Sequence, residues 1–310
     1  MTTQFTTGQA RQAELFASLH RVGDPLLLAN AWDAASAVAI AAAGAKAIAT
    51  TSAGVAWSLG VPDGAGLGAE RAAAVISRIA AAVSLPVSAD IEAGYGDSPD
   101  AVAATVAAVV EAGAVGVNLE DRRDGSSSLF EPSEQADRLA AARAAAAILT
   151  PVPGAPAVWI NARTDVFLTG AYSSTSAGVA AALDRAAAYQ AAGADSLFVP
   201  GLVDLAAIAE LAAGPLPVAV MAWPGAPAVA ELTAAGAIRI SLGSAIAQAA
   251  YGVATRAAAE LFTTGTYNSS GAGFEYGTMN DALTRSGAPD RRAALTRTTR
   301  GLSSIRAGPA

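Results

Sequence analysis

The sequence predicts an α/β protein built as a (β/α)8 barrel, with a doubly wound parallel sheet as the second possibility. Two observations lead to this fold class. Ala-rich helical patterns repeatedly end in Ala-Gly-Ala or a close variant, and a short β-branched run follows each of them. The glycine suits the left-handed residue that follows a helix. About eight such units in roughly 250 residues are typical of parallel strands closed into a barrel and wrapped by helices.

Each unit rests on a short apolar run that has the composition of a strand and precedes a helical pattern. Four runs belong to the repeated helix–glycine–strand copies, and four more lie outside them. The copies are residues 41–51, 110–120, 190–200 and 233–243, and the other runs are residues 26–32, 85–90, 157–163 and 216–222.

Other segments lie beside the strands. Residues 8–21 carry apolar side chains on one face and predict an N-terminal helix, and residues 244–262 predict a long helix after the last strand. Residues 169–178 are polar and predict a loop.

The C-terminal part differs in composition from the barrel. Residues 263–277 are rich in Gly, Ser and Thr and predict a loop, residues 278–286 predict one short helix, and the basic tail from Arg291 is expected to be loosely held. We therefore expect a barrel domain with its N-terminal helix at residues 1–262 and a C-terminal extension at residues 263–310.

The composition excludes several kinds of site. The chain has 310 residues, no cysteine, one histidine (His20) and one lysine (Lys46), so a Cys–zinc site, a Ser-His-Asp triad and a P-loop are poorly supported. The net charge of −7 argues against nucleic acid or an anionic membrane as partner. The start of the chain lacks a secretory pattern and no apolar run is long enough to span a membrane, so we expect a cytoplasmic protein.

Charged side chains gather where predicted strands end. Asp90 and Glu92 end one strand, Glu120 and Asp121 the next, and Arg163 with Asp165 a third. In a barrel of this kind, the carboxyl ends of the strands and the loops after them form the active site. Because buried carboxylates need a cation, an arginine or a proton, these residues predict one shared polar site.

Asp90, Glu92 and Glu120 admit two interpretations. As ligands they suit Mg²⁺, or Mn²⁺, which prefers carboxylate oxygen and often keeps several waters. Alternatively they form salt bridges with Arg163 or cap helices. Arg163 is equally open: it binds a substrate carboxylate through both guanidinium nitrogens, or it neutralises Glu120 or Asp165, or both.

Further candidates follow other strands. Thr51, Ser52, Ala53 and Gly54 form either a loop whose backbone N–H groups bind a carboxylate or a tight turn. Asp63 is either a general base or a turn residue. The remaining candidates for contact with a ligand are Trp32, Asp33 and Tyr95, of which Trp32 equally suits a pocket wall or the core.

Five motifs occur in order: NAWDAASA (30–37), TTSAGVAWSLGVPDG (50–64), DIEAGYGD (90–97), GVNLEDR (116–122) and NARTD (161–165). Together they resemble the isocitrate lyase/phosphoenolpyruvate mutase superfamily over about residues 24–262. The resemblance implies a (β/α)8 barrel, often with a helix swapped between subunits, and usually a homotetramer. It also implies Mg²⁺-dependent chemistry on a small 2-oxo or 2-hydroxy acid, through an enolate.

The resemblance also implies roles for individual residues. Asp90, Glu92 and Glu120 fall on metal-associated acids, and Arg163 falls on a carboxylate-binding arginine. The loop of Ser52, Ala53 and Gly54 falls on amides that hold a substrate carboxylate. Asp63 falls on a site aspartate; we consider it, with Asp121, as the base that would activate water in a hydrolysis.

One motif departs from the superfamily. Its lyases carry a gating loop with a Lys-Arg-Cys-Gly-type motif whose cysteine donates a proton, and its mutases carry Lys-x-Asn-Ser. Here residues 122–132 read RRDGSSSLFEP, with neither. The sequence therefore predicts a Mg²⁺-dependent lyase or hydrolase that cleaves a C–C bond of an oxaloacetate-like acid. The alternatives are C–P chemistry on a phosphonopyruvate-like substrate and a non-catalytic binder of a small carboxylate.

Overall fold

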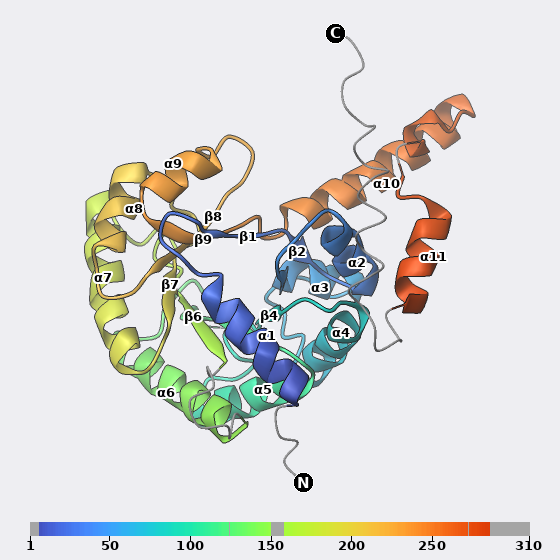
Figure 1. Ribbon diagram of the computed structural model, residues 1–310. Coiled ribbons are helices and arrows are strands. Elements are labelled where there is room, and N and C mark those ends of the chain that lie inside the picture. Colours follow the sequence, from blue (N-terminus) through green and yellow to red (C-terminus); the bar gives the residue numbers. More distant parts are fainter. Residues whose placement is uncertain (1–5, 124, 150–157, 272, 286–310) are drawn as a thin grey trace.

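The computed structural model describes residues 6–123, 125–149, 158–271 and 273–285. Nine parallel strands form a single sheet in the order β1-β9-β8-β7-β6-β5-β4-β3-β2, with helices around it (Figure 1). The strands are β1 (Leu26–Leu28), β2 (Asn30–Ala31), β3 (Ile48–Thr50), β4 (Val87–Asp90), β5 (Gly116–Glu120), β6 (Trp159–Arg163), β7 (Ser196–Phe198), β8 (Val218–Met221) and β9 (Ala237–Ser241).

Helices follow the strands, and one precedes them. They are α1 (Thr7–Ser18), α2 (Ala34–Ala42), α3 (Ser52–Ser58), α4 (Ala69–Ala82), α5 (Pro99–Glu111), α6 (Pro132–Leu149), α7 (Thr175–Ala191), α8 (Leu205–Ala212), α9 (Val229–Ala234), α10 (Ala245–Thr264), the 3₁₀ turn η1 (Asn268–Ser270) and α11 (Tyr276–Arg285). No helix in these ranges is long and apolar enough to cross a bilayer.

The sheet closes into the predicted barrel through one interrupted strand. β1 pairs with β9 and β2 pairs with β3, and only Ala29 separates β1 from β2. The Asn30 amide reinforces this closure: its nitrogen donates to the Thr50 carbonyl at 2.9 Å, and its oxygen accepts from the Leu242 N–H at 3.1 Å. The two half-strands together complete the eight predicted units.

Helix α1 closes the barrel at the amino ends of the strands. Phe16 is fully buried there, and a Cβ at Gly116, the first residue of β5, would lie 2.7 Å from its ring. His20 stacks on Trp159, the first residue of β6, with 4.1 Å between ring centroids. Glycine at position 116 therefore makes room for Phe16, and α1 acts as a plug at this end of the barrel.

The barrel interior is polar above this plug. The Asn118 side-chain oxygen accepts from Asn161 at 2.9 Å and from Arg239 at 3.0 Å, and Ser196 donates to Asn161 at 2.6 Å. Burial lowers the pKa of Arg239 to about 10, against the attraction of Asp90. The core between the sheet and the surrounding helices is almost entirely aliphatic. Apolar packing therefore attaches the helices to the sheet, whereas hydrogen bonds connect the strands inside the barrel.

The predicted flanking helices are confirmed with shifted ends. Residues 8–21 correspond to α1, residues 244–262 to α10 and residues 278–286 to α11. The loop prediction for residues 169–178 was wrong at its end, because Ser174 caps α7 by accepting the Ala177 N–H, which starts the helix at Thr175. The tail from Arg291 lies outside the described residues.

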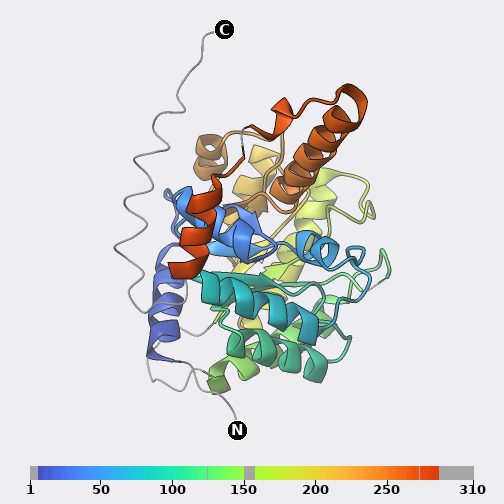
Figure 2. The same cartoon turned by 90° about the vertical axis from the view of Figure 1, so that its right-hand side faces the viewer.

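Helix α10 projects away from the barrel (Figures 1 and 2). Of its 20 residues only Ala247 is buried. Its exposed side chains include large apolar ones, with Phe262 82% and Leu261 51% exposed. The chain returns through η1 to α11, which packs on α2 and contributes Met279 and Ala282 to the apolar cluster there. Helix α10 therefore leaves most of its surface exposed, and the chain packs again on the barrel at α11.

Candidate active site

Asp90 ends β4 at the mouth of the barrel, which is the end formed by the carboxyl ends of the strands. Its N–H donates to the Thr50 hydroxyl at 2.9 Å, and its carboxylate accepts the N–H groups of Ser52 at 3.4 Å and Glu92 at 3.3 Å. Burial raises the pKa of Asp90, whereas Arg163 and these hydrogen bonds lower it. The carboxylate is thus held between the end of its own strand and the start of α3.

The turn after Asp90 has a strained backbone. Glu92 and Tyr95 have φ angles of 50° and 53°, the left-handed region that residues with a Cβ seldom adopt. The Glu92 carbonyl accepts the Glu120 N–H at 3.0 Å, which fixes the ends of two neighbouring strands. Such strain costs roughly 1–3 kcal/mol per residue and is concentrated at functional sites.

Arg163 is an internal counter-ion at the end of β6. Its Nε and NH2 donate to the two oxygens of Asp165 at 2.6 and 3.0 Å, and its NH1 lies 2.8 Å from Glu120. These contacts match the neutralising role, and binding of a substrate carboxylate by Arg163 stays a prediction. All three guanidinium nitrogens are engaged by the protein's own carboxylates.

Negative charge nevertheless exceeds positive charge at the mouth. Burial raises the pKa of Glu120 to about 8, and Asp165 and Asp90 add to the increase while Arg163 and Arg122 oppose it. Arg122 approaches only loosely, with its Nε 3.7 Å from Glu120 and 3.5 Å from Asp165. A further cation at the mouth would therefore favour the ionised form of these carboxyl groups.

Asp121 lies behind the mouth and is fully buried. One of its oxygens accepts the Asp165 N–H at 2.9 Å, and the other accepts from Arg185 at 3.1 Å and Tyr189 at 2.8 Å. Burial raises the pKa of Asp121, against those contacts. Both oxygens are used inside the protein, so this carboxylate is not presented to a substrate as the base considered from the sequence would be.

The segment from Thr51 to Gly54 is the start of a helix, not the loop expected from the sequence. Thr51 is the N-cap of α3, so Ser52, Ala53 and Gly54 supply its first N–H groups. A Cβ at Gly54 would lie 2.8 Å from Thr51 and 2.9 Å from Trp32, so only glycine allows this packing. The first turn of α3 thereby lies against Asp90.

The other predicted residues lie around this centre. Asp33 caps α2, with its carboxylate accepting the Ser36 N–H at 2.7 Å. Trp32 lies 6.5 Å from the ring of Tyr251 on α10, and Tyr95 packs against the core. Asp63 is exposed in a turn, and its charge raises the pKa of Asp90 as the smallest of five causes.

The sequence did not predict two residues that hydrogen-bond to Asp121. Arg185 and Tyr189 lie four residues apart on α7 and hold Asp121 from 64 and 68 residues away. No local pattern marks them, because both stand in an ordinary Ala-rich helix. Only the three-dimensional contact identifies their role.

The residues at the mouth suit a hydrated Mg²⁺ rather than a closed metal cage. Within the described ranges, no group of three His, Cys, Asp or Glu side chains forms a metal cluster. The donors are carboxylate oxygens, and three carboxyl groups (Asp90, Glu120 and Asp165) surround Arg163, which pairs tightly with two of them. Mg²⁺ needs only one or two carboxylates because it keeps water ligands, so the donor set fits.

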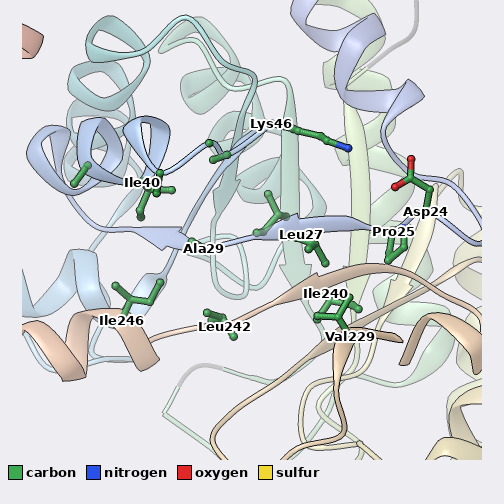
Figure 3. A pocket seen from close by; sticks show the side chains of 15 residues that line it. Asp24, Pro25, Leu27, Ala29, Ile40, Lys46, Val229, Ile240, Leu242 and Ile246 are labelled. Carbon is green, nitrogen blue, oxygen red and sulfur yellow. The ribbon is translucent and has the colours of Figure 1, made fainter. Parts of the chain in front are cut away.

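A hollow lies on the outside of the barrel and is largely apolar, although Asp24 and Lys46 also line it (Figure 3). It has a volume of about 620 Å³ and runs between α2 and the segment from α9 to α10. Leu27, 50% exposed on the outer face of β1, lies in it with Leu242, which is 37% exposed. Most of its lining cannot bind a charged substrate, so this groove is distinct from the candidate active site.

Comparisons with known proteins show what the chain is similar to in sequence and fold. A solved structure of a proposed phosphonomutase from Burkholderia cenocepacia J2315 is 43% identical, with a TM-score of 0.75 over 83% of this chain and 100% of that one. The 2-methylisocitrate lyase of Escherichia coli is 34% identical over 61% of this chain and 62% of its own. An oxaloacetate decarboxylase of Rhodopseudomonas palustris is 34% identical over 46% and 47% of the two chains.

The family model described as phosphoenolpyruvate phosphomutase matches residues 16–262, which include every strand of the barrel and all the acids at its mouth. The chain therefore belongs to the phosphoenolpyruvate phosphomutase family, within the isocitrate lyase/phosphoenolpyruvate mutase superfamily.

Proposed function

We propose that the protein is a Mg²⁺-dependent lyase or hydrolase that breaks a C–C bond of a small 2-oxo acid through an enolate. The observation that carries this proposal is the placement of three carboxyl groups, Asp90, Glu120 and Asp165, around a single tightly bound arginine at the carboxyl ends of the strands. The relatives support it in kind, because one is a 2-methylisocitrate lyase and another an oxaloacetate decarboxylase. An oxaloacetate-like substrate is our first choice.

The mouth residues would divide the work. Asp90, with Glu92 and Glu120 near it, would hold Mg²⁺. When bound, the ion supplies positive charge that stabilises an enolate as it forms. The first N–H groups of α3 would orient a substrate carboxylate beside Asp90. Arg163 would hold Glu120 and Asp165 in place through its ion pairs with them rather than contact the substrate itself. In a hydrolysis, Asp63 would accept the proton of the attacking water.

The test is product release from oxaloacetate with Mg²⁺ present and after EDTA treatment. We expect metal-dependent release of pyruvate, or of oxalate if water attacks instead. Phosphate released from phosphonopyruvate would favour the C–P alternative. We retain that alternative because the chain is 43% identical to the proposed phosphonomutase. Oxalate binding without turnover of any 2-oxo acid would favour a binder and contradict the proposal.

We also propose a homo-oligomer, a tetramer by family resemblance, in which α10 packs on a neighbouring subunit. Helix α10 leaves its own barrel with only Ala247 buried, and the outer groove beside it exposes Leu27 and Leu242. An apolar helix and an apolar groove on the same chain complement each other across a closed symmetric assembly. This arrangement also suits the proposed division between the barrel and the C-terminal extension.

A further inference from the structure

We propose that Arg122 binds a second anionic group of the substrate and so selects 2-oxo acids that carry one. This inference rests on the proposed function and adds the substrate class. Arg122 directly follows Asp121 on the loop after β5. Its Nε lies 3.7 Å from Glu120 and 3.5 Å from Asp165, so its charge is at the mouth where those two carboxylates meet Arg163.

The two arginines differ in what their guanidinium groups already bind. Arg163 has a 13% exposed side chain, and all three of its nitrogens contact Glu120 or Asp165 at 2.6–3.0 Å. Arg122 has a 36% exposed side chain, and its two contacts are longer than hydrogen bonds. In the part of the chain that the structure describes, its guanidinium has no hydrogen-bond partner. An incoming anion would therefore meet Arg122 without breaking an existing hydrogen bond.

The loop holds Arg122 by its backbone. Arg122 pairs with Leu129 in an antiparallel bridge, the Arg123 N–H donates to the Ser128 carbonyl at 3.0 Å, and the Phe130 N–H donates to the Asp121 carbonyl at 2.8 Å. These contacts close a short hairpin whose base, not its tip, carries Arg122.

The charge of the site also favours this role. Asp90, Glu92 and Glu120 would face a metal and a 2-oxo carboxylate, and none of them attracts a second anion. A guanidinium offers parallel N–H groups that match a carboxylate or a phosphonate. Arg122 thus fits acids such as oxaloacetate or phosphonopyruvate better than pyruvate or 2-oxobutyrate, whose tails carry no charge.

The neighbouring Arg123 is a matched control. It has the same charge on the same hairpin, but its NH2 contacts Glu134 at 2.7 Å and its guanidinium lies over the Phe130 ring at 4.0 Å. Arg123→Ala removes a surface cation next to Arg122 without touching Glu120 or Asp165. It separates a specific contact from a general loss of positive charge.

The experiment measures binding in Mg²⁺ by titration calorimetry for wild type, Arg122→Ala, Arg122→Gln and Arg123→Ala. The probes are of three kinds. Oxalate mimics the enolate of the 2-oxo acid and has no tail beyond it, 2-oxobutyrate has an uncharged tail, and 3,3-difluorooxaloacetate and phosphonopyruvate have a charged tail. We expect both Arg122 variants to bind the charged-tail acids about tenfold more weakly and to bind oxalate within twofold of wild type. Arg123→Ala should match wild type for all four.

The outcomes are distinct. If wild type binds oxalate but does not prefer charged tails, or if the Arg122 variants keep that preference, the role of Arg122 is wrong and the proposed function stands. An equal effect of Arg123→Ala would likewise overturn it. If wild type binds neither oxalate nor any 2-oxo acid with Mg²⁺, both proposals fail. The larger loss among the two charged-tail probes indicates whether the second group is a carboxylate or a phosphonate.

Discussion

Arg163 and Asp165, two residues apart after β6, form a bidentate ion pair in which Nε and NH2 donate to the two carboxylate oxygens at 2.6 and 3.0 Å. Asp165 is fully buried, and its N–H is held by Asp121. The orientation of Arg163 therefore depends on Asp165, whose backbone is held by Asp121, and Arg185 and Tyr189 hold Asp121 in turn.

Asp165→Asn should be strongly destabilising. The change takes away the charge-assisted hydrogen bonds that Arg163 Nε and NH2 donate to Asp165 in a buried site, and we expect the free energy of unfolding to fall by about 3 kcal/mol. Asp195→Asn is the control, since Asp195 pairs with Arg143 but is 33% exposed, and it should cost about 1 kcal/mol. Urea unfolding of both variants measures the difference, and equal losses would argue against a special role for the Arg163–Asp165 pair.

Asp90→Asn should abolish Mg²⁺-dependent turnover and weaken Mg²⁺ binding. Asp90 is held at the end of β4 by the Thr50 hydroxyl, so the fold should tolerate the isosteric change. We expect at least a hundredfold loss of activity and no measurable heat of Mg²⁺ binding by calorimetry. Asp137→Asn, on the exposed face of α6, should change neither. Unchanged Mg²⁺ affinity in the Asp90 variant would place the metal elsewhere.

His20 should make the protein less stable in acid. Burial and the nearby Arg239 lower the pKa of His20 to about 3, although the Phe16 carbonyl opposes this. Because the pKa in the folded state is below the unfolded value of about 6.5, the unfolded chain takes up the proton first. The contribution of neutral His20 is therefore complete above pH 6.5 and is lost as the pH falls from 6.5 towards 3.

The test compares urea midpoints of wild type and His20→Gln at pH 7.5 and pH 5. Other groups titrate in both proteins, so only the difference reports on His20. Wild type should lose about 1 kcal/mol more than the variant over this interval, after allowance for the partial exposure of the ring. Parallel losses in the two proteins would mean that His20 is protonated equally easily when folded.

The barrel was predictable because its signals are local. Glycine after each helix, short apolar strands and acids at strand ends all lie within a few residues of one another, and the strand ends were indeed brought together. Contacts between distant segments were not predictable. The sequence does not reveal that Phe16 fills the space above Gly116, or that Arg185 donates a hydrogen bond to Asp121.

The arginine at the end of β6 shows the same limit. From the sequence, Arg163 suited either a substrate or an internal carboxylate, and its chemistry is the same in both cases. Only the distances to Glu120 and Asp165 reveal that its donors are already used. Conversely, Arg122 carries no signal beyond its place next to two acids, and its exposed guanidinium becomes visible only in the folded hairpin.

Leu27→Asp should disrupt the proposed oligomer. Leu27 is half exposed on the outer face of β1, so a charge there should leave the barrel folded but prevent an apolar helix from packing in the groove. Light scattering at micromolar concentration should give an oligomeric wild type and a smaller Leu27→Asp species. Ile148→Asp, 69% exposed on α6, should remain oligomeric. A monomeric wild type would remove the claim.

The protein should not cleave isocitrate or 2-methylisocitrate at a useful rate, even though it is 34% identical to the 2-methylisocitrate lyase of Escherichia coli over 61% of its length. Cleavage of those substrates leaves a carbanion-like enolate that must be protonated on one face, and a positioned general acid contributes roughly 10²–10⁴-fold to the rate. The superfamily lyases use a cysteine on the gating loop, and this chain has none.

In the described part of the corresponding hairpin, the hydroxyl groups are poor substitutes for the cysteine. Ser126 and Ser128 are exposed and hydrogen-bond each other at 2.8 Å, and an alcohol is a far weaker acid than a thiol. Decarboxylation of a 2-oxo acid avoids this difficulty, because carbon dioxide leaves without a proton donor and water can protonate the enolate. Hydrolysis needs a base instead, for which Asp63 is available. Both reactions therefore remain open to a chain that lacks the cysteine.

A substrate panel with Mg²⁺ decides the matter. Product release should be followed for isocitrate, 2-methylisocitrate and oxaloacetate under identical conditions, with an EDTA-treated sample as the blank. Pyruvate or oxalate should appear from oxaloacetate alone, and the two tricarboxylates should give rates at least a hundredfold lower, as expected without a positioned acid. Glyoxylate or pyruvate formed from isocitrate or 2-methylisocitrate at ordinary enzymatic rates would show that another group replaces the cysteine.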